Sequence, residues 1–262
     1  MTTSPLPSHS ITHSSSSVSG VPFSPLSERA SQIRDLVRSF VRDKVIVGER
    51  AFSSAVDADR WVKPVIMEEW KAEAKSQGLW NLFLPDSELG AGLSHLEYAH
   101  IAEEMGWSVI ASEAFNCSAP DTGNMEVLWR YGSESQRERF LTPLLAGEIR
   151  SAFAMTEPHV ASSDATNMEA TLTPAEGGYK LNAHKWWTTG ALDPHCGVFI
   201  VMAKSGEEGP RHQRHSMVLV PRDAVGIELV RPLHVFGYDD APSGHAEVKF
   251  TDVMIPKEDV IL

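Results

Sequence analysis

The chain has 262 residues, with 23 basic and 35 acidic side chains and a formal net charge of −12. This acidic balance argues against a nucleic-acid binder, which needs a basic face. No apolar run has the length of a membrane span, so we expect none. Cys117 and Cys196 are far apart and lack a CxxC pattern, which indicates a reducing compartment without a disulfide framework.

Residues 1–23 are rich in serine, threonine and proline and contain neither lysine nor arginine. A secretory signal has a basic start and an apolar stretch, and a mitochondrial presequence has arginines. The segment has neither feature, so we expect a disordered tail. The chain also ends without a peroxisomal tripeptide. We expect a cytoplasmic protein, or a peroxisomal one whose signal lies on further sequence.

Residues 24–148 have the pattern of an all-helical domain. Ser24 and Pro25 suit an N-cap and a first turn, and apolar residues then recur at helical spacing. Ser94 with Glu97 forms a capping-box motif. Caps, prolines and glycines delimit further helices, which we place at 64–78, 94–106, 125–131 and 133–147.

Residues 149–262 have the pattern of short strands. β-branched and aromatic runs alternate with polar residues and turn signals, which predicts a small antiparallel β-barrel domain. The expected strands are 151–155, 168–173, 179–182, 198–203, 217–220, 227–230 and 245–250. The expected fold class is therefore α+β, with the domain boundary near residue 148.

Two stretches of the β half carry the functional signal. Residues 153–164 read FAMTEPHVASSD, a strand end followed by small and hydroxyl residues that can approach a planar polar ligand. Residues 185–190 read KWWTTG, where strand alternation directs one tryptophan to the core and leaves the other to flank a ligand. Taken singly, each stretch is better explained by ordinary packing.

Together, the two stretches resemble the signature of the acyl-CoA dehydrogenase family. Thr156-Glu157-Pro158 matches the first family motif, and a Lys-x-Trp-x-Thr segment follows about thirty residues later. Further similar segments are 84–94, 131–136, 143–148 and 231–242. The last, RPLHVFGYDDAP, is similar to the subgroup of vertebrate family members ten and eleven. The resemblance covers residues 24–262, and the helical C-terminal bundle of the family has no counterpart in the sequence.

The resemblance implies FAD as cofactor and the 2,3-dehydrogenation of an acyl-CoA thioester. It also implies an electron-acceptor flavoprotein as partner and allows a homo-oligomer. The positions that match FAD contacts of the family are Phe153, Met155, Thr156, Ala161, Ser162, Trp187 and Thr189. Ser162 also matches a position near the thioester of the substrate. The Gly-x-Gly turn of the family is replaced by His159-Val160-Ala161, in which each lost glycine adds a Cβ.

No residue is assigned as the catalytic base, because the base of this family lies on the C-terminal helical domain. Glu157 is interpreted as a structural carboxylate. His212 and His215 are interpreted as solvated histidines rather than metal ligands, and Asp239-Asp240 as a solvated turn.

Three hypotheses remain open. The chain is a shortened FAD-dependent acyl-CoA dehydrogenase, a catalytically inactive remnant or binding protein, or an acyl-CoA oxidase-like flavoenzyme. The acyl chain of the substrate is not predicted.

Overall fold

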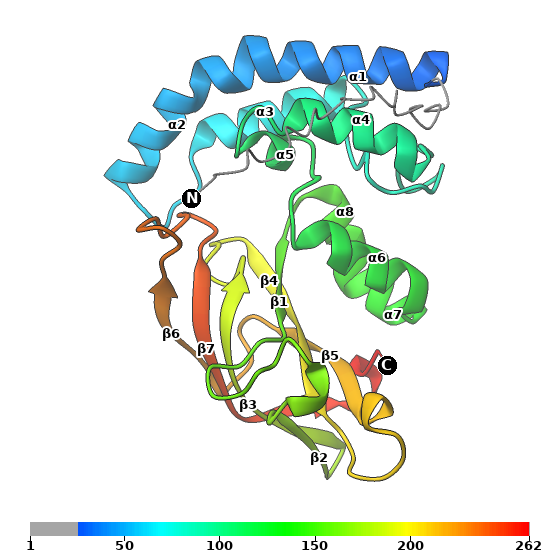
Figure 1. Ribbon diagram of the computed structural model, residues 1–262, viewed down its shortest axis with the longest axis vertical. Helices are drawn as coiled ribbons and strands as arrows, with labels where there is room; N and C mark the ends of the chain where they lie inside the picture. The colour runs from blue at the N-terminus through cyan, green and yellow to red at the C-terminus, as the bar shows by residue number, and fades with distance from the viewer. Residues whose placement is uncertain (1–25, 262) are drawn as a thin grey trace, which may run out of the picture.

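The computed structural model describes residues 26–261, so the predicted tail over 1–23 lies outside the described part. The helical half contains α1 (Glu28–Phe40), α2 (Ile46–Ala58), α3 (Val65–Ser76), α4 (His95–Met105), α5 (Ala111–Ala114), α6 (Asp121–Tyr131), α7 (Glu134–Gln136) and α8 (Thr142–Ala146). The β half contains β1 (Arg150–Ala154), β2 (Thr171–Ala175), β3 (Gly178–Thr189), β4 (Cys196–Lys204), β5 (His215–Pro221), β6 (Ile227–Leu233) and β7 (His245–Pro256). Figure 1 shows the helices above a curled sheet.

Local capping sets the helix starts. Ser27 caps α1 by accepting a backbone N–H three residues on, whereas the predicted cap, Ser24, lies outside the described residues. A π-helical turn at Val41–Val45 joins α1 to α2 without a break. The capping box predicted at the start of α4 is confirmed: Ser94 Oγ accepts the N–H of Glu97 at 3.3 Å, and the Glu97 carboxylate accepts the N–H of Ser94 at 2.9 Å.

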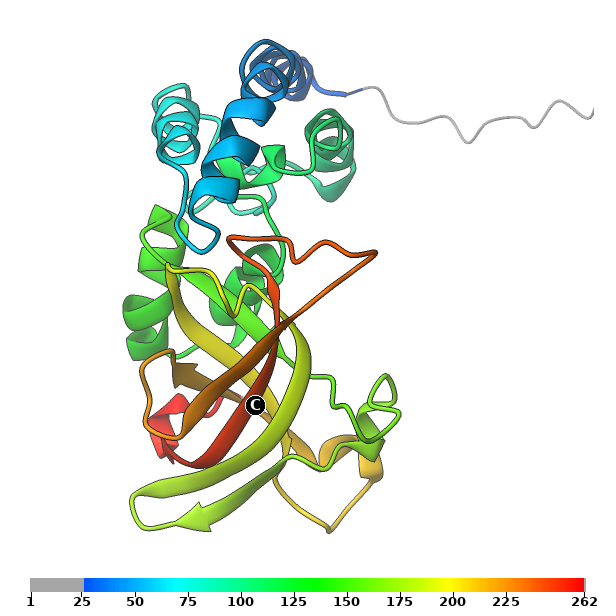
Figure 2. The same cartoon turned by 90° about the vertical axis from the view of Figure 1, so that its left-hand side faces the viewer.

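The sheet has seven strands in the order β1-β4-β2-β3-β7-β6, with β5 paired to β4. The predicted α+β class is confirmed, and Figure 2 shows the sheet curling into a partly closed barrel. The sheet is mixed rather than wholly antiparallel, because β1 and β4 run parallel, with Ser151 opposite Val198. The β2–β3 hairpin lies between them in the chain and returns β4 beside β1 in the same direction.

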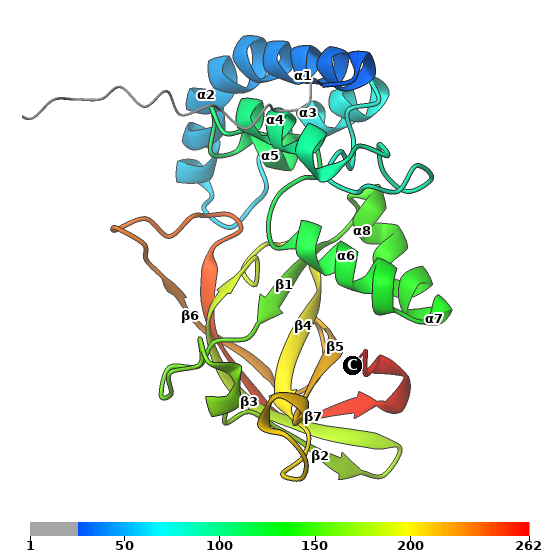
Figure 3. The same cartoon turned by 45° about the vertical axis from the view of Figure 1, so that its right-hand side comes forward.

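Strand β4 explains how the two halves share a core. Val198 and Ile200 belong to the core under the helices, whereas Phe199 and Val201 belong to the core inside the curled sheet. A strand that is buried on both faces reads as a continuous apolar run rather than as an alternation. Figure 3 shows α6 and α8 beside β1 and β4, on the first of these faces.

A buried group of charges also connects the halves. Lys63, just before α3, donates to Glu113 at 2.8 Å and to Asp193, after β3, at 2.7 Å. Arg150, which begins β1, pairs with Glu113 at 2.9 Å and with Asp121 of α6. Burial opposes the ionised form of Glu113, but Arg150 and Lys63 hold the pKa of this carboxyl well below its usual range. The start of β1 is thereby fixed against α5 and α6.

Only a short segment of the described chain follows β7. After β7 a 3-10 turn at Lys257–Asp259 packs back on the helical half, where Arg139 donates to Asp259 at 2.6 Å. Residues 26–261 include no helical domain after the sheet. No helix in this range combines the length and the apolar character needed to cross a bilayer.

Candidate functional site

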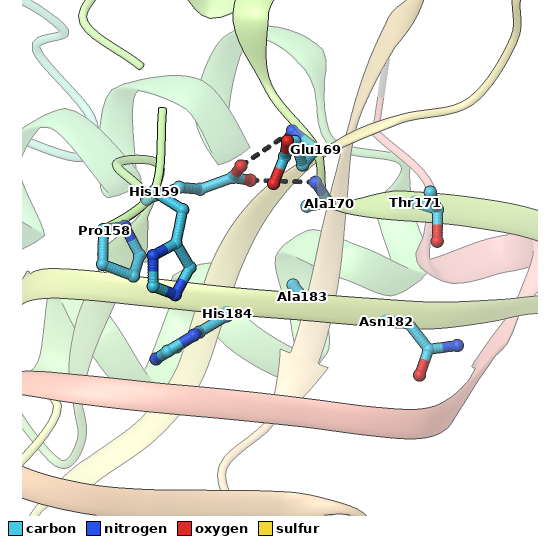
Figure 4. A pocket seen from close by; sticks show the side chains of 9 residues that line it. Pro158, His159, Glu169, Ala170, Thr171, Asn182, Ala183 and His184 are labelled. Atoms are coloured by element: carbon cyan, nitrogen blue, oxygen red, sulfur yellow. Dashed lines mark hydrogen bonds between the residues drawn. The ribbon is translucent and has the colours of Figure 1, made fainter. Parts of the chain in front are cut away.

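The loop after β1 is fixed to β3 by a buried ion pair. Glu157 accepts from Lys185 Nζ at 2.8 Å, and both side chains are buried. The Glu157 carboxylate also accepts the backbone N–H groups of Glu169 at 2.7 Å and Ala170 at 3.0 Å, as the dashed lines in Figure 4 mark. Burial lowers the pKa of Lys185 despite its bond to Glu157. Glu157 is therefore engaged in holding the loop, in agreement with its interpretation as a structural carboxylate.

The structure brings the two signature stretches together. The backbone N–H of Trp186 donates to the carbonyl of Thr156 at 3.0 Å, and Thr156 Oγ1 donates to the carbonyl of Trp186 at 2.8 Å. Lys185 Nζ adds a bond of 2.8 Å to the carbonyl of Met155. Phe153, Met155 and Thr156 are all half-buried at this junction. The end of β1 and the end of β3 thus form one surface.

The loop at 158–163 turns around a buried hydroxyl. Ser162 Oγ accepts the backbone N–H of Glu157 at 2.7 Å and is 4% exposed, whereas Ala161 is exposed. His159, Val160 and Ala161 all keep φ outside the positive region, so the Cβ atoms that replace the family's glycines add no backbone strain.

This loop has unused hydrogen-bond donors. Within residues 26–261, the backbone N–H groups of His159, Val160, Ala161 and Ser163 have no acceptor. Several backbone N–H groups in one short loop suit an anion such as a diphosphate. The donor set therefore fits the phosphate part of FAD, which was expected near Ala161 and Ser162.

Trp187 lies in an unusual backbone conformation. A β-bulge interrupts the pairing of β3 with β7 between Lys185 and Thr188, and Trp187 adopts φ +51°. A bulky residue rarely has positive φ, and such residues cluster at functional sites. Trp187 is 40% exposed, and Trp186 is half-buried. The expectation of one core tryptophan is wrong, because the bulge breaks the alternation of β3.

Sequence reasoning missed two residues beside Thr189. Thr189 Oγ1 lies 2.9 Å from His245 Nδ1, and His245 Nε2 lies 2.7 Å from a carboxylate oxygen of Asp240. Asp239 is bound by Arg60 of the helical half, with Nε at 2.6 Å. The interpretation of Asp239-Asp240 as a solvated turn is therefore wrong for Asp239, which is buried, whereas Asp240 is exposed and pairs with His245. The pairing of Thr189 with His245 depends on strand register, which no local motif reveals.

Two cavities lie near these elements. A cavity of about 220 Å³ has Pro158 and His159 on one wall and Asn182 and His184 of β3 on the other (Figure 4). The rings of His159 and His184 meet edge to face across it, with centroids 5.4 Å apart. A second cavity, of about 280 Å³, lies in the helical half and is lined by Phe83, His95, Tyr98, Thr122, Gly123 and Glu126.

Comparison with known proteins decides the family. The acyl-CoA dehydrogenase N-terminal domain model matches residues 27–148, and the acyl-CoA dehydrogenase middle domain model matches residues 152–253. This chain belongs to the acyl-CoA dehydrogenase family. The recognition from the two signature stretches is thereby confirmed.

Individual relatives agree with this assignment. Acyl-CoA dehydrogenase family member 10 of Mus musculus is 51% identical over 90% of the chain, which spans 23% of that relative's length. An acyl-CoA dehydrogenase structure from Mycobacterium abscessus has a TM-score of 0.88 and 48% identity, over 91% of this chain and 61% of that one. PigA in complex with FAD has a TM-score of 0.72 and 26% identity, over 91% and 59% of the two chains.

Proposed function

We propose that this acyl-CoA dehydrogenase chain forms the N-terminal and FAD-binding part of an enzyme that oxidises an acyl-CoA thioester between carbons 2 and 3. The observation that carries the proposal is the joining of the two signature stretches by the Thr156–Trp186 hydrogen bonds. This joining places an exposed tryptophan, a threonine hydroxyl and a donor-rich loop on adjacent segments. FAD, when bound, would supply the acceptor for the hydride that leaves the thioester.

The proposed FAD contacts are Phe153, Met155, Thr156, Ala161, Ser162, Trp187 and Thr189. Trp187 offers a partly exposed aromatic face, which suits stacking or edge contact with a flat ring system. The loop at 159–163 offers free N–H groups for the diphosphate. Ser162 acts mainly from inside the loop, because its hydroxyl is already bonded to Glu157. The same hydroxyl also donates to the carbonyl oxygen of Glu157 at 3.4 Å, so its proposed place near the thioester depends on the shape of this loop.

We propose that the two halves are separate domains with different roles and that the boundary between them lies near residue 148. The helical half over 24–148 forms one wall for the acyl chain, and the β half over 149–262 holds FAD. The proposed partners are an acyl-CoA substrate, an electron-accepting flavoprotein and further copies of the chain. Glu157 is not proposed as the base, since its carboxylate already accepts three hydrogen bonds. No described residue is proposed for that role.

The test is an absorbance spectrum of the purified chain with FAD, followed by anaerobic addition of acyl-CoAs of different lengths. Bleaching of the flavin band by one acyl-CoA would support a working dehydrogenase. Rapid recolouring in air with release of peroxide would instead favour the oxidase-like alternative. Bound FAD that no acyl-CoA bleaches would favour the inactive or binding protein, and a chain that binds no FAD would contradict the proposal.

A further inference from the structure

Thr189, His245 and Asp240 form a continuous chain of polar contacts at the end of β3. Thr189 and His245 are register partners across β3 and β7, which fixes their side chains on the same face of the sheet. The hydroxyl lies 2.9 Å from Nδ1 of the imidazole, and the carboxylate lies 2.7 Å from Nε2. A hydroxyl, an imidazole and a carboxylate thus stand in line beside Trp187, whose ring centroid is 6.3 Å from that of His245.

The chemistry of these groups sets the direction of each hydrogen bond. An ionised carboxylate can only accept, so Nε2 of His245 carries a proton that it donates to Asp240. In a neutral imidazole the other nitrogen then accepts. While His245 is neutral, the single proton of the Thr189 hydroxyl is therefore donated to Nδ1. With its proton donated to His245, the Thr189 oxygen can accept a further hydrogen bond but cannot donate one.

The loop that carries Asp240 is held in place from the helical half. The neighbouring Asp239 accepts from Arg60 Nε at 2.6 Å, and this bond lowers the pKa of Asp239. Asp240 itself has φ +51°, and its backbone carbonyl accepts the N–H of Gly244 at 2.8 Å. The carboxylate is therefore presented to His245 by a loop with defined backbone bonds. In the described part of the chain, Asp240 is the one ion-pair partner of His245.

We propose that Asp240 and His245 are positioning residues that turn the Thr189 hydroxyl into a hydrogen-bond acceptor for an N–H group of the bound ligand. This inference rests on the proposed FAD site. The reduced isoalloxazine ring carries ring N–H groups that the oxidised ring lacks. A hydroxyl that can only accept therefore binds the reduced ring better than the oxidised ring.

The first arm of the test needs no FAD. Nitrogen-15 NMR of the histidine rings of the full chain at pH 8 reports which ring nitrogen of His245 is protonated. The expected result is a proton on Nε2 and none on Nδ1, with the Nδ1 resonance moving in Thr189→Val. A proton on Nδ1 would overturn the proposal, because the Thr189 hydroxyl would then be free to donate.

The second arm uses oxidised FAD and the two-electron midpoint potential of the bound flavin. His245→Phe should lower the preference for reduced over oxidised FAD roughly fivefold, which corresponds to about 20 mV toward negative potential. His234→Phe is the control, because His234 is an exposed histidine on the β6–β7 loop that also carries Asp240. In a Thr189→Val background, His245→Phe should not change the midpoint potential of the bound flavin any further.

The outcomes separate this inference from the function on which it rests. FAD that binds His245→Phe with an unchanged potential would overturn the role of His245 and leave the FAD site standing. An equal shift from His245→Phe with and without the Thr189 hydroxyl would show that the histidine acts by another route. A wild-type chain that binds neither form of FAD would overturn the proposed function itself.

Discussion

The buried pair of Glu157 and Lys185 should be the strongest single determinant of the signature loop. Both side chains lie almost entirely out of solvent, at 4% and 0% exposure. Lys185→Met removes the ammonium and leaves the Glu157 carboxylate buried, with two backbone N–H donors at 2.7 and 3.0 Å. Removal of one partner from a buried pair costs about 3–5 kcal/mol, because the remaining charge is uncompensated.

Urea unfolding followed by tryptophan fluorescence measures this loss as a change in the free energy of unfolding. The matched control is Lys180→Met on the same strand, where the lysine is 42% exposed and lies 3.5 Å from Asp252. This exposed pair should contribute less than about 1 kcal/mol. The double variant Glu157→Gln with Lys185→Met should lose less than the sum of the two single variants.

A Lys185→Met variant no less stable than Lys180→Met would refute this reasoning about the loop. So would additive losses in the double variant, since additivity means that the two side chains do not stabilise each other. A large, non-additive loss of stability in the variants of Glu157 and Lys185, with little loss in Lys180→Met, would show that the ion pair between the loop and β3 stabilises the proposed FAD loop.

Two further predictions concern other parts of the chain. Gly190→Ala should lower the free energy of unfolding by roughly 3 kcal/mol, because the residue has φ +83° and a Cβ would lie 2.5 Å from the carbonyl oxygen of Ser151. Gly177→Ala, at φ +79° with open space around it, should lower it by about 1 kcal/mol in the same urea assay. Equal losses would refute the claim that the contact with Ser151 adds a steric cost at Gly190. Hydrogen bonds from Ser27, and then from the backbone and side chain of Ser94, lower the pKa of Glu97 to about 2. The stabilising effect of the Glu97 carboxylate should be complete above its unfolded pKa of about 4.3 and decline as the pH falls toward 2. The difference in unfolding free energy between wild type and Glu97→Gln should therefore shrink between pH 6.5 and 3.5. A constant difference would contradict the lowered pKa of Glu97.

Local sequence predicted much of the architecture. The capping box at Ser94 and Glu97 is read from four consecutive residues, and the helix behind it follows. The change from helical to strand pattern near residue 148 gave the order of the two halves. The signature stretches could be recognised because the chemistry of their side chains is concentrated in short segments, and the structure joins them through Thr156 and Trp186.

Long-range register accounts for what the sequence did not reveal. The bulge that exposes Trp187 exists because β3 and β7 pair with an offset, and nothing within the KWWTTG segment specifies that offset. His245 lies 56 residues from Thr189 and meets it only through the same pairing. The parallel pairing of β1 with β4 likewise depends on where the β2–β3 hairpin returns the chain.

The central claim is that the two signature stretches form one FAD site, and an FAD titration of the full chain tests it most directly. Quenching of protein fluorescence gives the dissociation constant for wild type, Trp187→Ala and Trp107→Ala. The last variant removes a tryptophan of the helical half that is more exposed than Trp187, at 65% against 40%. The account predicts saturable binding that weakens at least tenfold in Trp187→Ala and is unchanged in Trp107→Ala. Equal affinities in all three proteins, or no saturable binding in the wild type, would contradict it.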